Sequence, residues 1–358
     1  MCQVLSSQRD QMATSVVSTA PYVVTDFVSN VSITLERNEN YWQTDEELQN
    51  PVYKNMTVDK LSYTKIAEAA QQTIALETGA VDVFEGISNT EVANFLEGGR
   101  DAANFTALGY ASPLSYIFYF SNTGIMAEDI ELRKAVTYAI DKDTIIQGAL
   151  DGLAVSPTFY GAPDGLSDLT PTNASEDYMA YDADKAAEAL ANSSYSGEQI
   201  RLLVPNEDSH SKIASIIQGQ LMAIGLDVAI ETYDNAMFQS NLGDGSTWDI
   251  AICQMGMADV AFVWDFLSWD LMGGDAGSMG MGLKDDTLTG LLQDVSSVDG
   301  HTNENATKVT DYINENFYGE NLASMKQYWI YRKGLNATEV PYFSMMNQVF
   351  YTGSTVFE

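Results

Sequence analysis

The clearest hydrophobic pattern in the chain lies between residues 116 and 146. The run Tyr116–Phe120 is aromatic and β-branched, which predicts a buried strand. After it, apolar residues recur at helical spacing, as in a helix that buries one stripe against a sheet: Leu132, Val136, Ala139 and Ile140. We expect this helix to end at Ile140, because Asp141 can cap a second helix that starts at Asp143.

Strands and helices alternate along the rest of the chain. Polar and apolar residues alternate in some segments and form continuous apolar runs in others, which predicts strands at 31–36, 58–66, 81–84, 199–204, 227–231, 248–253 and 340–351. Helical composition predicts helices at 67–78, 183–192, 209–223, 236–242, 286–297, 303–317 and 319–330, with Gly79 as the stop of the first. This order indicates an α/β fold.

Size and charge narrow the class of protein. With 358 residues the chain is too long for one ordinary core, which predicts two lobes. It has 17 basic and 50 acidic residues, a net charge of −33, which argues against nucleic acid and anionic membranes as partners. The excess of negative charge weakly favours cationic ligands, but a contribution to solubility is the simpler explanation of this excess. The sequence contains no run of about 18 consecutive apolar residues, so no transmembrane helix is predicted. No signal peptide is recognisable at its start.

The residues offer little for catalysis. A Ser-His-Asp triad needs a histidine, and the chain has only His210 and His301, with no Gly-x-Ser-x-Gly elbow. Cys2 and Cys253 make neither a disulfide framework nor a metal site. A carboxylate pair for glycoside hydrolysis stays open, because 50 acids make chance pairs inevitable. We therefore expect a binding protein with no cofactor and no metal, and keep a glycoside hydrolase as the alternative from another class.

Four stretches carry recognisable motifs in a fixed order: Pro21-Tyr22 with Arg37-Asn38-Glu39-Asn40-Tyr41-Trp42, Glu77-Thr78-Gly79-Ala80-Val81-Asp82, Leu132-Arg133-Lys134-Ala135 with Tyr138-Ala139-Ile140-Asp141-Lys142, and Tyr181-Asp182-Ala183-Asp184-Lys185 with Ile224-Gly225-Leu226. Together they resemble family 5 of the extracellular solute-binding proteins, the oligopeptide and dipeptide binders of ABC transporters. One departure is Ala20, where the family has glycine. Another is that family members carry roughly a third of their length before this point, so the chain resembles an N-terminally truncated member.

The resemblance implies a two-lobed periplasmic-binding-protein-like fold of type II, with lobe one incomplete. Lobe one would comprise 1–117, with 346–358 returning to it, and lobe two 118–345. The implied function is non-catalytic: a monomer outside the cytoplasm captures peptides between the lobes and delivers them to an ABC permease. The signal or lipid anchor is expected to be absent from this chain. An oligosaccharide-binding member is the alternative within the family, which Trp264 and Trp269 keep open, and scarce histidine disfavours nickel.

The resemblance also implies a set of ligand-binding residues. Asp259 would pair with the α-ammonium group of the peptide, and the backbone of Met255, Gly256 and Met257 would bind its main chain as an added strand does. His210 falls where some members meet the C-terminal carboxylate. The remaining expected positions are the cleft edge of lobe one and the two hinges: Phe84, Glu85, Gly86, Tyr119, Asn122 and Met345.

Overall fold

The computed structural model describes residues 20–45, 47–48, 58–85, 89–158, 160, 169–173, 177–256, 264–274, 280–337 and 349–351. The chain divides into two compact units: unit one comprises 1–110 and 327–358, and unit two comprises 111–326. Two long strands, β5 (Phe105–Phe120) and β10 (Gly319–Arg332), each have residues in both units. The lobe boundaries expected at 117 and 345 stay predictions.

Unit one contains a three-stranded antiparallel sheet in the order β1 (Tyr22–Val28), β2 (Ser32–Arg37), β3 (Lys60–Thr64). Helix α3 (Ala69–Thr78) ends at Gly79, whose φ of 77° is the left-handed conformation that glycine adopts without strain, so this predicted stop is confirmed. The unit also holds β4 (Val83–Glu85), α4 (Asn89–Val92), β11 (Leu335–Ala337) and β12 (Val349–Tyr351). Strand β4 pairs antiparallel with β10.

Unit two is built on a mixed sheet in which β10, β5, β9 (Ile250–Gly256), β7 (Gln199–Pro205) and β8 (Asp227–Tyr233) follow one another. Strand β7 runs parallel to both β8 and β9, whereas β5 runs antiparallel to β9. The short strand β6 (Ala154–Val155) pairs with β10. The strands at 199–204, 227–231 and 248–253 were therefore correctly predicted.

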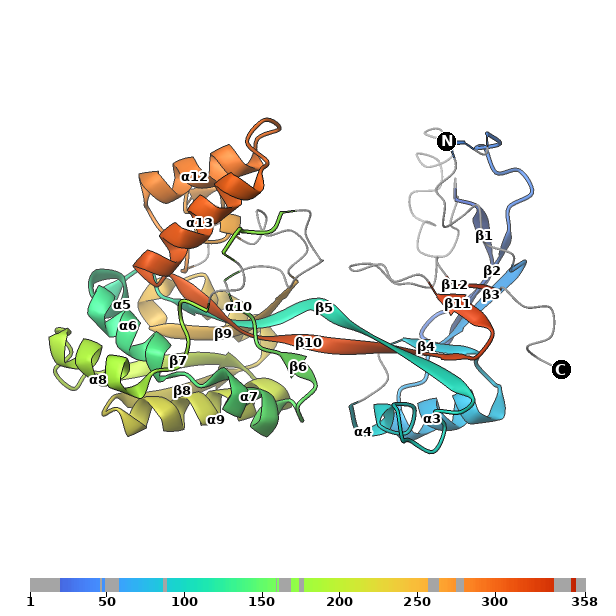
Figure 1. Cartoon of the computed structure of the whole chain (residues 1–358), viewed down its shortest axis with the longest axis horizontal. Coiled ribbons are helices and arrows are strands. Elements are labelled where there is room, and N and C mark those ends of the chain that lie inside the picture. The colour runs from blue at the N-terminus through green and yellow to red at the C-terminus, as the bar shows by residue number, and fades with distance from the viewer. Residues whose placement is uncertain are drawn as a thin grey trace. The chain divides into compact units, whose positions relative to one another are not determined.

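Helices cover both faces of the sheet in unit two (Figure 1). One face packs against α5 (Gly124–Glu128), α6 (Ile130–Ala139), α7 (Lys142–Ala149), α8 (Ala183–Asn192) and α9 (Asp208–Ala223), and the other against α10 (Asn235–Leu242), α12 (Asp286–Ser296) and α13 (Asn303–Asn316). Strand β5 serves both cores, because Tyr116, Phe118 and Phe120 join one cluster and Ile117 and Tyr119 the other. This explains its continuous apolar run.

The break between α6 and α7 lies where the sequence predicts it. Ile140 has extended backbone angles, and the carboxylate of Asp141 accepts hydrogen bonds from the backbone N–H groups of Asp143 and Thr144. The side chain of Asp129 caps α6 in the same way at Leu132. Both caps satisfy first-turn N–H groups that a helix leaves unpaired.

The helix predicted at 319–330 is wrong, because these residues form strand β10. Leu322, Ala323 and Met325 favour a helix by intrinsic propensity, which explains the error. In the structure this segment pairs with β4 and β6 and neighbours β5, so tertiary pairing overrides local preference.

Candidate functional site

Three parallel strands of unit two end at one edge of its sheet. Strand β7 ends at Pro205, β8 at Tyr233 and β9 at Gly256. The part of β5 that pairs with the end of β9 begins at this edge, because Leu114 lies opposite Gly256. In open α/β sheets, ligands bind outside the carboxyl ends of the strands, which makes this edge the first candidate.

Strand β9 is paired unequally on its two sides at this edge. Its pairing with β5 continues to Gly256, but in the described part of the chain its ladder with β7 ends at Ala251, opposite Leu203. Backbone groups of alternate residues in a strand point to opposite sides. Between Cys253 and Gly256, some N–H and C=O groups therefore point away from β5 without a ladder partner among the described strands. We call Cys253–Gly256, together with Tyr116, Glu207, Ser209 and His210, the β9 edge.

His210 is buried in the first turn of α9, with 2% of its surface exposed. Its Nδ1 lies 3.0 Å from a carboxylate oxygen of Glu207, and its ring packs edge-on against Tyr116 with ring centroids 5.0 Å apart. Neither ring nitrogen has a hydrogen-bond partner among the described residues, so the contact with Glu207 is one of ion-pair distance only. Burial lowers the pKa of His210 and the Glu207 carboxylate opposes this shift in part, so the fold favours the neutral imidazole.

The start of α9 lacks its usual side-chain cap. Glu207 occupies the N-cap position with extended backbone, but its side chain makes no capping hydrogen bond. The hydroxyl of Tyr116 donates a hydrogen bond of 2.9 Å to Oγ of Ser209, and burial raises the pKa of this phenol. The helix start therefore offers backbone N–H groups, a hydroxyl and a neutral imidazole beside the open part of β9.

The opposite face of the sheet at this edge is closed by packing. The hydroxyls of Ser115 and Ser324 lie 2.8 Å apart and are both buried. The hydroxyl of Tyr119 donates to Sδ of Met255 at 3.3 Å, and burial raises the pKa of Tyr119 far above its usual value. These contacts hold the end of β9 in place on the side away from α9.

The structure brings some of the expected ligand residues together. Met255 and Gly256 form the end of β9, His210 lies at the start of the neighbouring α9, and Tyr119 is a fully buried partner of Met255. Asn122 lies elsewhere in unit two. Phe84 and the backbone of Glu85 belong to β4 in unit one, opposite Ile330 and Trp329 of β10. The predictions for Asp259, Met257, Gly86 and Met345 fall outside the described residues.

Asn122 lines a hollow at the other end of the sheet, where β5 ends and β9 begins. This pocket has a volume of about 770 Å³ and is also lined by Arg133, Trp269 and Lys284. The backbone N–H of Asn122 donates to the carbonyl of Gly280, and its Nδ2 donates to the carbonyl of Gly282, both at 2.7 Å. Asn122 thus connects the end of β5 to the loop before α12 in the lining of this pocket.

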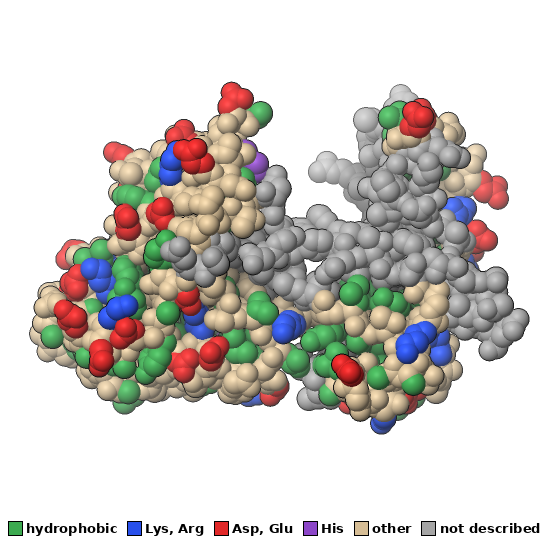
Figure 2. Space-filling model, in the orientation of Figure 1, with side chains coloured by type: hydrophobic (Ala, Val, Ile, Leu, Met, Phe, Trp, Pro, Cys, Tyr) green, Lys and Arg blue, Asp and Glu red, His purple; other side chains and the backbone are tan. Residues whose placement is uncertain are grey.

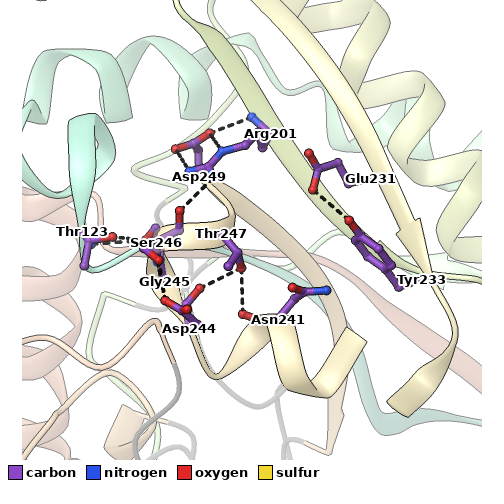
Figure 3. A network of polar contacts seen from close by, with 11 residues as sticks. Thr123, Arg201, Glu231, Tyr233, Asn241, Asp244, Gly245, Ser246, Thr247 and Asp249 are labelled. Carbon is purple, nitrogen blue, oxygen red and sulfur yellow. Dashed lines mark hydrogen bonds and ion pairs between the residues drawn. The ribbon is translucent and has the colours of Figure 1, made fainter. Parts of the chain in front are cut away.

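A network of polar contacts lies at the same end of the sheet of unit two, before the start of β9 (Figure 3). The guanidinium of Arg201 binds both carboxylate oxygens of Asp249, at 2.9 and 3.0 Å, and also donates to the carbonyl of Ser246. The carboxylate of Asp244 accepts from the hydroxyl of Ser246 at 2.6 Å. Each of these charged or polar groups is satisfied within the network, which indicates a structural role.

Sequence reasoning did not identify Glu207, Ser209, Tyr116 and Gln254 as part of a site. Gln254 is exposed and lies opposite Tyr116 across the β5–β9 ladder. The available signal was the predicted succession of a strand at 199–204 and a helix from 209, since the turn between them lies at a carboxyl edge. The register of β5 against β9 places Tyr116 beside this turn, and that register cannot be predicted from the local sequence.

Across the described residues, no group of three or more His, Cys, Asp or Glu side chains is placed to hold a metal ion. Within the same residues, none of the helices is both long and apolar enough to cross a membrane.

The model of the bacterial extracellular solute-binding proteins, family 5 Middle, matches residues 5–277. The nickel-binding periplasmic protein of Escherichia coli (strain K12) is 25% identical over 248 residues, which cover 64% of this chain and 44% of that protein. The oligopeptide-binding protein OppA of Bacillus subtilis (strain 168) is 24% identical over 253 residues, 67% of this chain and 43% of that protein. The chain thus spans less than half the length of these relatives.

Solved structures share the fold. The periplasmic binding protein DppA from Helicobacter pylori, in complex with the peptide STSA, superposes with a TM-score of 0.69 at 20% identity. That superposition covers 98% of this chain and 66% of the other. The substrate-binding protein CtaP from Listeria monocytogenes gives a TM-score of 0.75 at 16% identity, covering 99% of this chain and 71% of that one.

Proposed function

Because the chain belongs to family 5 of the bacterial extracellular solute-binding proteins, we propose that it is the solute-binding subunit of an ABC importer that captures peptides and delivers them to a membrane permease. Members of this family are transport binding proteins and not enzymes, and the chain has the α/β fold of the type II periplasmic binding proteins. Binding takes place outside the cytoplasm, where the solute is first met.

The open side of β9 is the observation that carries the peptide proposal. An extended peptide can pair with the backbone groups of Cys253–Gly256 that have no ladder partner among the described strands, and so continue the sheet as in β-strand addition. Such pairing uses the main chain of the ligand, so it accepts many side chains. The exposed side chain of Gln254 adds an amide that can donate to or accept from a ligand.

The two ends of the peptide would be recognised by different groups. The start of α9 supplies backbone N–H groups, the Ser209 hydroxyl and the buried imidazole of His210, all of which can donate to a terminal carboxylate. Asp259, which follows β9 in the sequence, is proposed from the family resemblance to pair with the α-ammonium group. A carboxylate in a water-poor site is stabilised by such a cation.

The geometry of two tryptophans supports a peptide over an oligosaccharide as the ligand. An oligosaccharide site commonly needs an exposed tryptophan face. Trp264 is fully buried and its Nε1 donates to the carbonyl of Tyr160. The ammonium group of Lys284 lies over the ring of Trp269, 4.4 Å from the ring centroid, in a cation–π contact.

Titration calorimetry with defined peptides of two to six residues tests the proposal. We expect saturable binding with one peptide per chain and no product by mass spectrometry. The substitution Asp259→Ala should weaken binding of a peptide with a free N-terminus and leave an N-acetylated peptide unaffected. Binding of an oligosaccharide but of no peptide would refute the peptide proposal, and substrate turnover would refute the binding role.

A further inference from the structure

We propose that binding of a carboxylate-ended ligand at the β9 edge is coupled to the uptake of one proton by His210. This inference rests on the proposed function, since it concerns the same edge. It adds a regulatory property to that edge, namely that affinity for an acidic ligand end rises as the pH falls. The proton comes from the solvent and converts the neutral imidazole into imidazolium.

The two ring nitrogens of His210 face different surroundings. Both nitrogens are buried and make no hydrogen bond in the described part of the chain, but Nδ1 lies 3.0 Å from a carboxylate oxygen of Glu207. A neutral imidazole carries one N–H and can donate to only one acceptor. If a ligand carboxylate approaches Nε2, the ring lies between two carboxylates, and only the protonated form donates to both.

The other groups around His210 do not supply the missing charge. Within the described residues, Glu207 is the charged side chain that acts on the pKa of His210. From β5 the neighbour is Tyr116, which stays neutral because burial raises the pKa of its hydroxyl. Across the ladder from Tyr116 lies the uncharged Gln254. Among the described residues, a second carboxylate would therefore meet Glu207 without a compensating cation unless His210 takes up a proton.

The free protein holds His210 on the neutral side of this equilibrium. Burial opposes its charge, and Glu207, whose side chain is 63% exposed, offsets that effect only in part. Arrival of an anion adds a second, more enclosed carboxylate and raises the pKa of the imidazole. By linkage, the same coupling makes ligand affinity increase with acidity, by at most about tenfold per pH unit for one proton.

Calorimetry in two buffers of different ionisation enthalpy measures the proton directly. At pH 7, we expect a peptide with a free C-terminal carboxylate to bind with uptake of between half a proton and one proton, and the same peptide with a C-terminal amide to bind with none. The substitution His210→Gln should abolish the uptake. The chain has only one other histidine, His301, so His301→Gln is the matched control and should leave the uptake unchanged.

The outcomes separate this inference from the proposed function. If no peptide binds, the proposed function fails. If the free-acid peptide binds with no net proton uptake, the function stands and the coupling is refuted. Far-UV circular dichroism and thermal unfolding of H210Q, compared with those of the unaltered chain, show whether the variant folds. If that variant does not fold, NMR titration of the two imidazole signals in the unaltered chain decides, because the coupling requires the pKa of His210 to rise with ligand while that of His301 does not.

Discussion

At the residue scale, Lys142 carries a charge in a nearly closed part of unit two. Its side chain is 6% exposed, and its Nζ lies 2.8 Å from Glu320 and 3.0 Å from Asp177 and donates to the carbonyl of Pro157 at 2.9 Å. The contacts connect the first turn of α7, strand β10 and the segment between β6 and α8. A buried charge is tolerated only when it is paired in this way.

We predict that Lys142→Met lowers the free energy of unfolding by about 3 kcal/mol, because it leaves the carboxylate of Glu320 buried without its cation. Denaturant unfolding of the variant and the parent measures the difference. Lys185→Met is the matched control, since Lys185 is exposed and its ion pair with Asp182 should contribute less than about 1 kcal/mol. Equal losses in the two variants would contradict the prediction.

Glu320 should also impose a pH dependence on stability. Burial raises its pKa from 4.5 to about 7, against the opposing effect of Lys142. Between these values the folded chain binds more protons at this group than the unfolded chain, so the contribution of Glu320 to stability falls as the pH rises from 4.5 towards 7. Chemical denaturation across this range should show this slope in the parent and lose it in Glu320→Gln. An unchanged slope in the variant would show that another group is responsible.

At the scale of elements, the absence of side chains at Gly245 and Gly280 allows three segments of unit two to cross at short distance. A Cβ added to Gly245 would lie 2.5 Å from Oδ1 of Asn122 and 3.0 Å from the carbonyl oxygen of Gly280. The carbonyl of Gly245 accepts from the hydroxyl of Ser121. These contacts join the end of β5, the segment before β9 and the loop before α12, and they form the floor of the pocket that Asn122 lines.

We predict that Gly245→Ala destabilises the chain by about 1–3 kcal/mol, because the backbone around the new methyl group has to move. Gly219→Ala provides the control: Gly219 is inside α9, and its added Cβ would meet nothing within 4 Å. In that position alanine should stabilise the helix by roughly 0.5–1 kcal/mol. Thermal unfolding of both variants distinguishes them, and a neutral Gly245→Ala would contradict the crossing.

The elements also show what sequence could and could not provide. The break after Ala139 was predictable because both of its causes are local: an apolar stripe ends and Asp141 caps the next helix. Strand β10 was missed because its partners are distant in sequence, with Trp329 opposite Glu85 and Met325 opposite Ala154. Its residues favour a helix when their neighbours in space are unknown.

The candidate site was predictable only in part, for the same reason. Met255, Gly256 and His210 were identified through the family resemblance, which carries information about spatial position that composition lacks. The role of Glu207 depends on the angle at which α9 begins, and that of Tyr116 depends on the register of β5 against β9. Neither follows from local pattern. Asp259 remains a prediction, since it lies outside the described residues.

At the scale of the whole molecule, the net charge of −33 should make stability depend on salt. Acidic side chains are spread over the visible face of unit two rather than gathered into one patch (Figure 2). Repulsion among them opposes the compact state, and it weakens when salt reduces the screening length from about 8 Å at 0.15 M to about 3 Å at 1 M.

We therefore predict that the midpoint of thermal unfolding at pH 7 rises by about 5 °C or more between about 0.15 M and 1 M NaCl. Repeating the scan near pH 4, where many carboxylates are protonated, serves as the control and should show a much smaller increase. A midpoint that is flat or falls with salt at pH 7 would mean that the acidic surface does not limit stability.

The proposed peptide-binding role depends on a peptide pairing with the side of β9 that has no ladder partner among the described strands. Hydrogen exchange of the backbone amides of Cys253–Gly256, measured with and without a saturating peptide, tests this pairing most directly. We expect exchange to slow several-fold or more at alternate residues of this segment, while the amides of β8 and of the pocket that Asn122 lines keep their rates. Unchanged exchange at Cys253–Gly256 under saturating peptide would contradict the account.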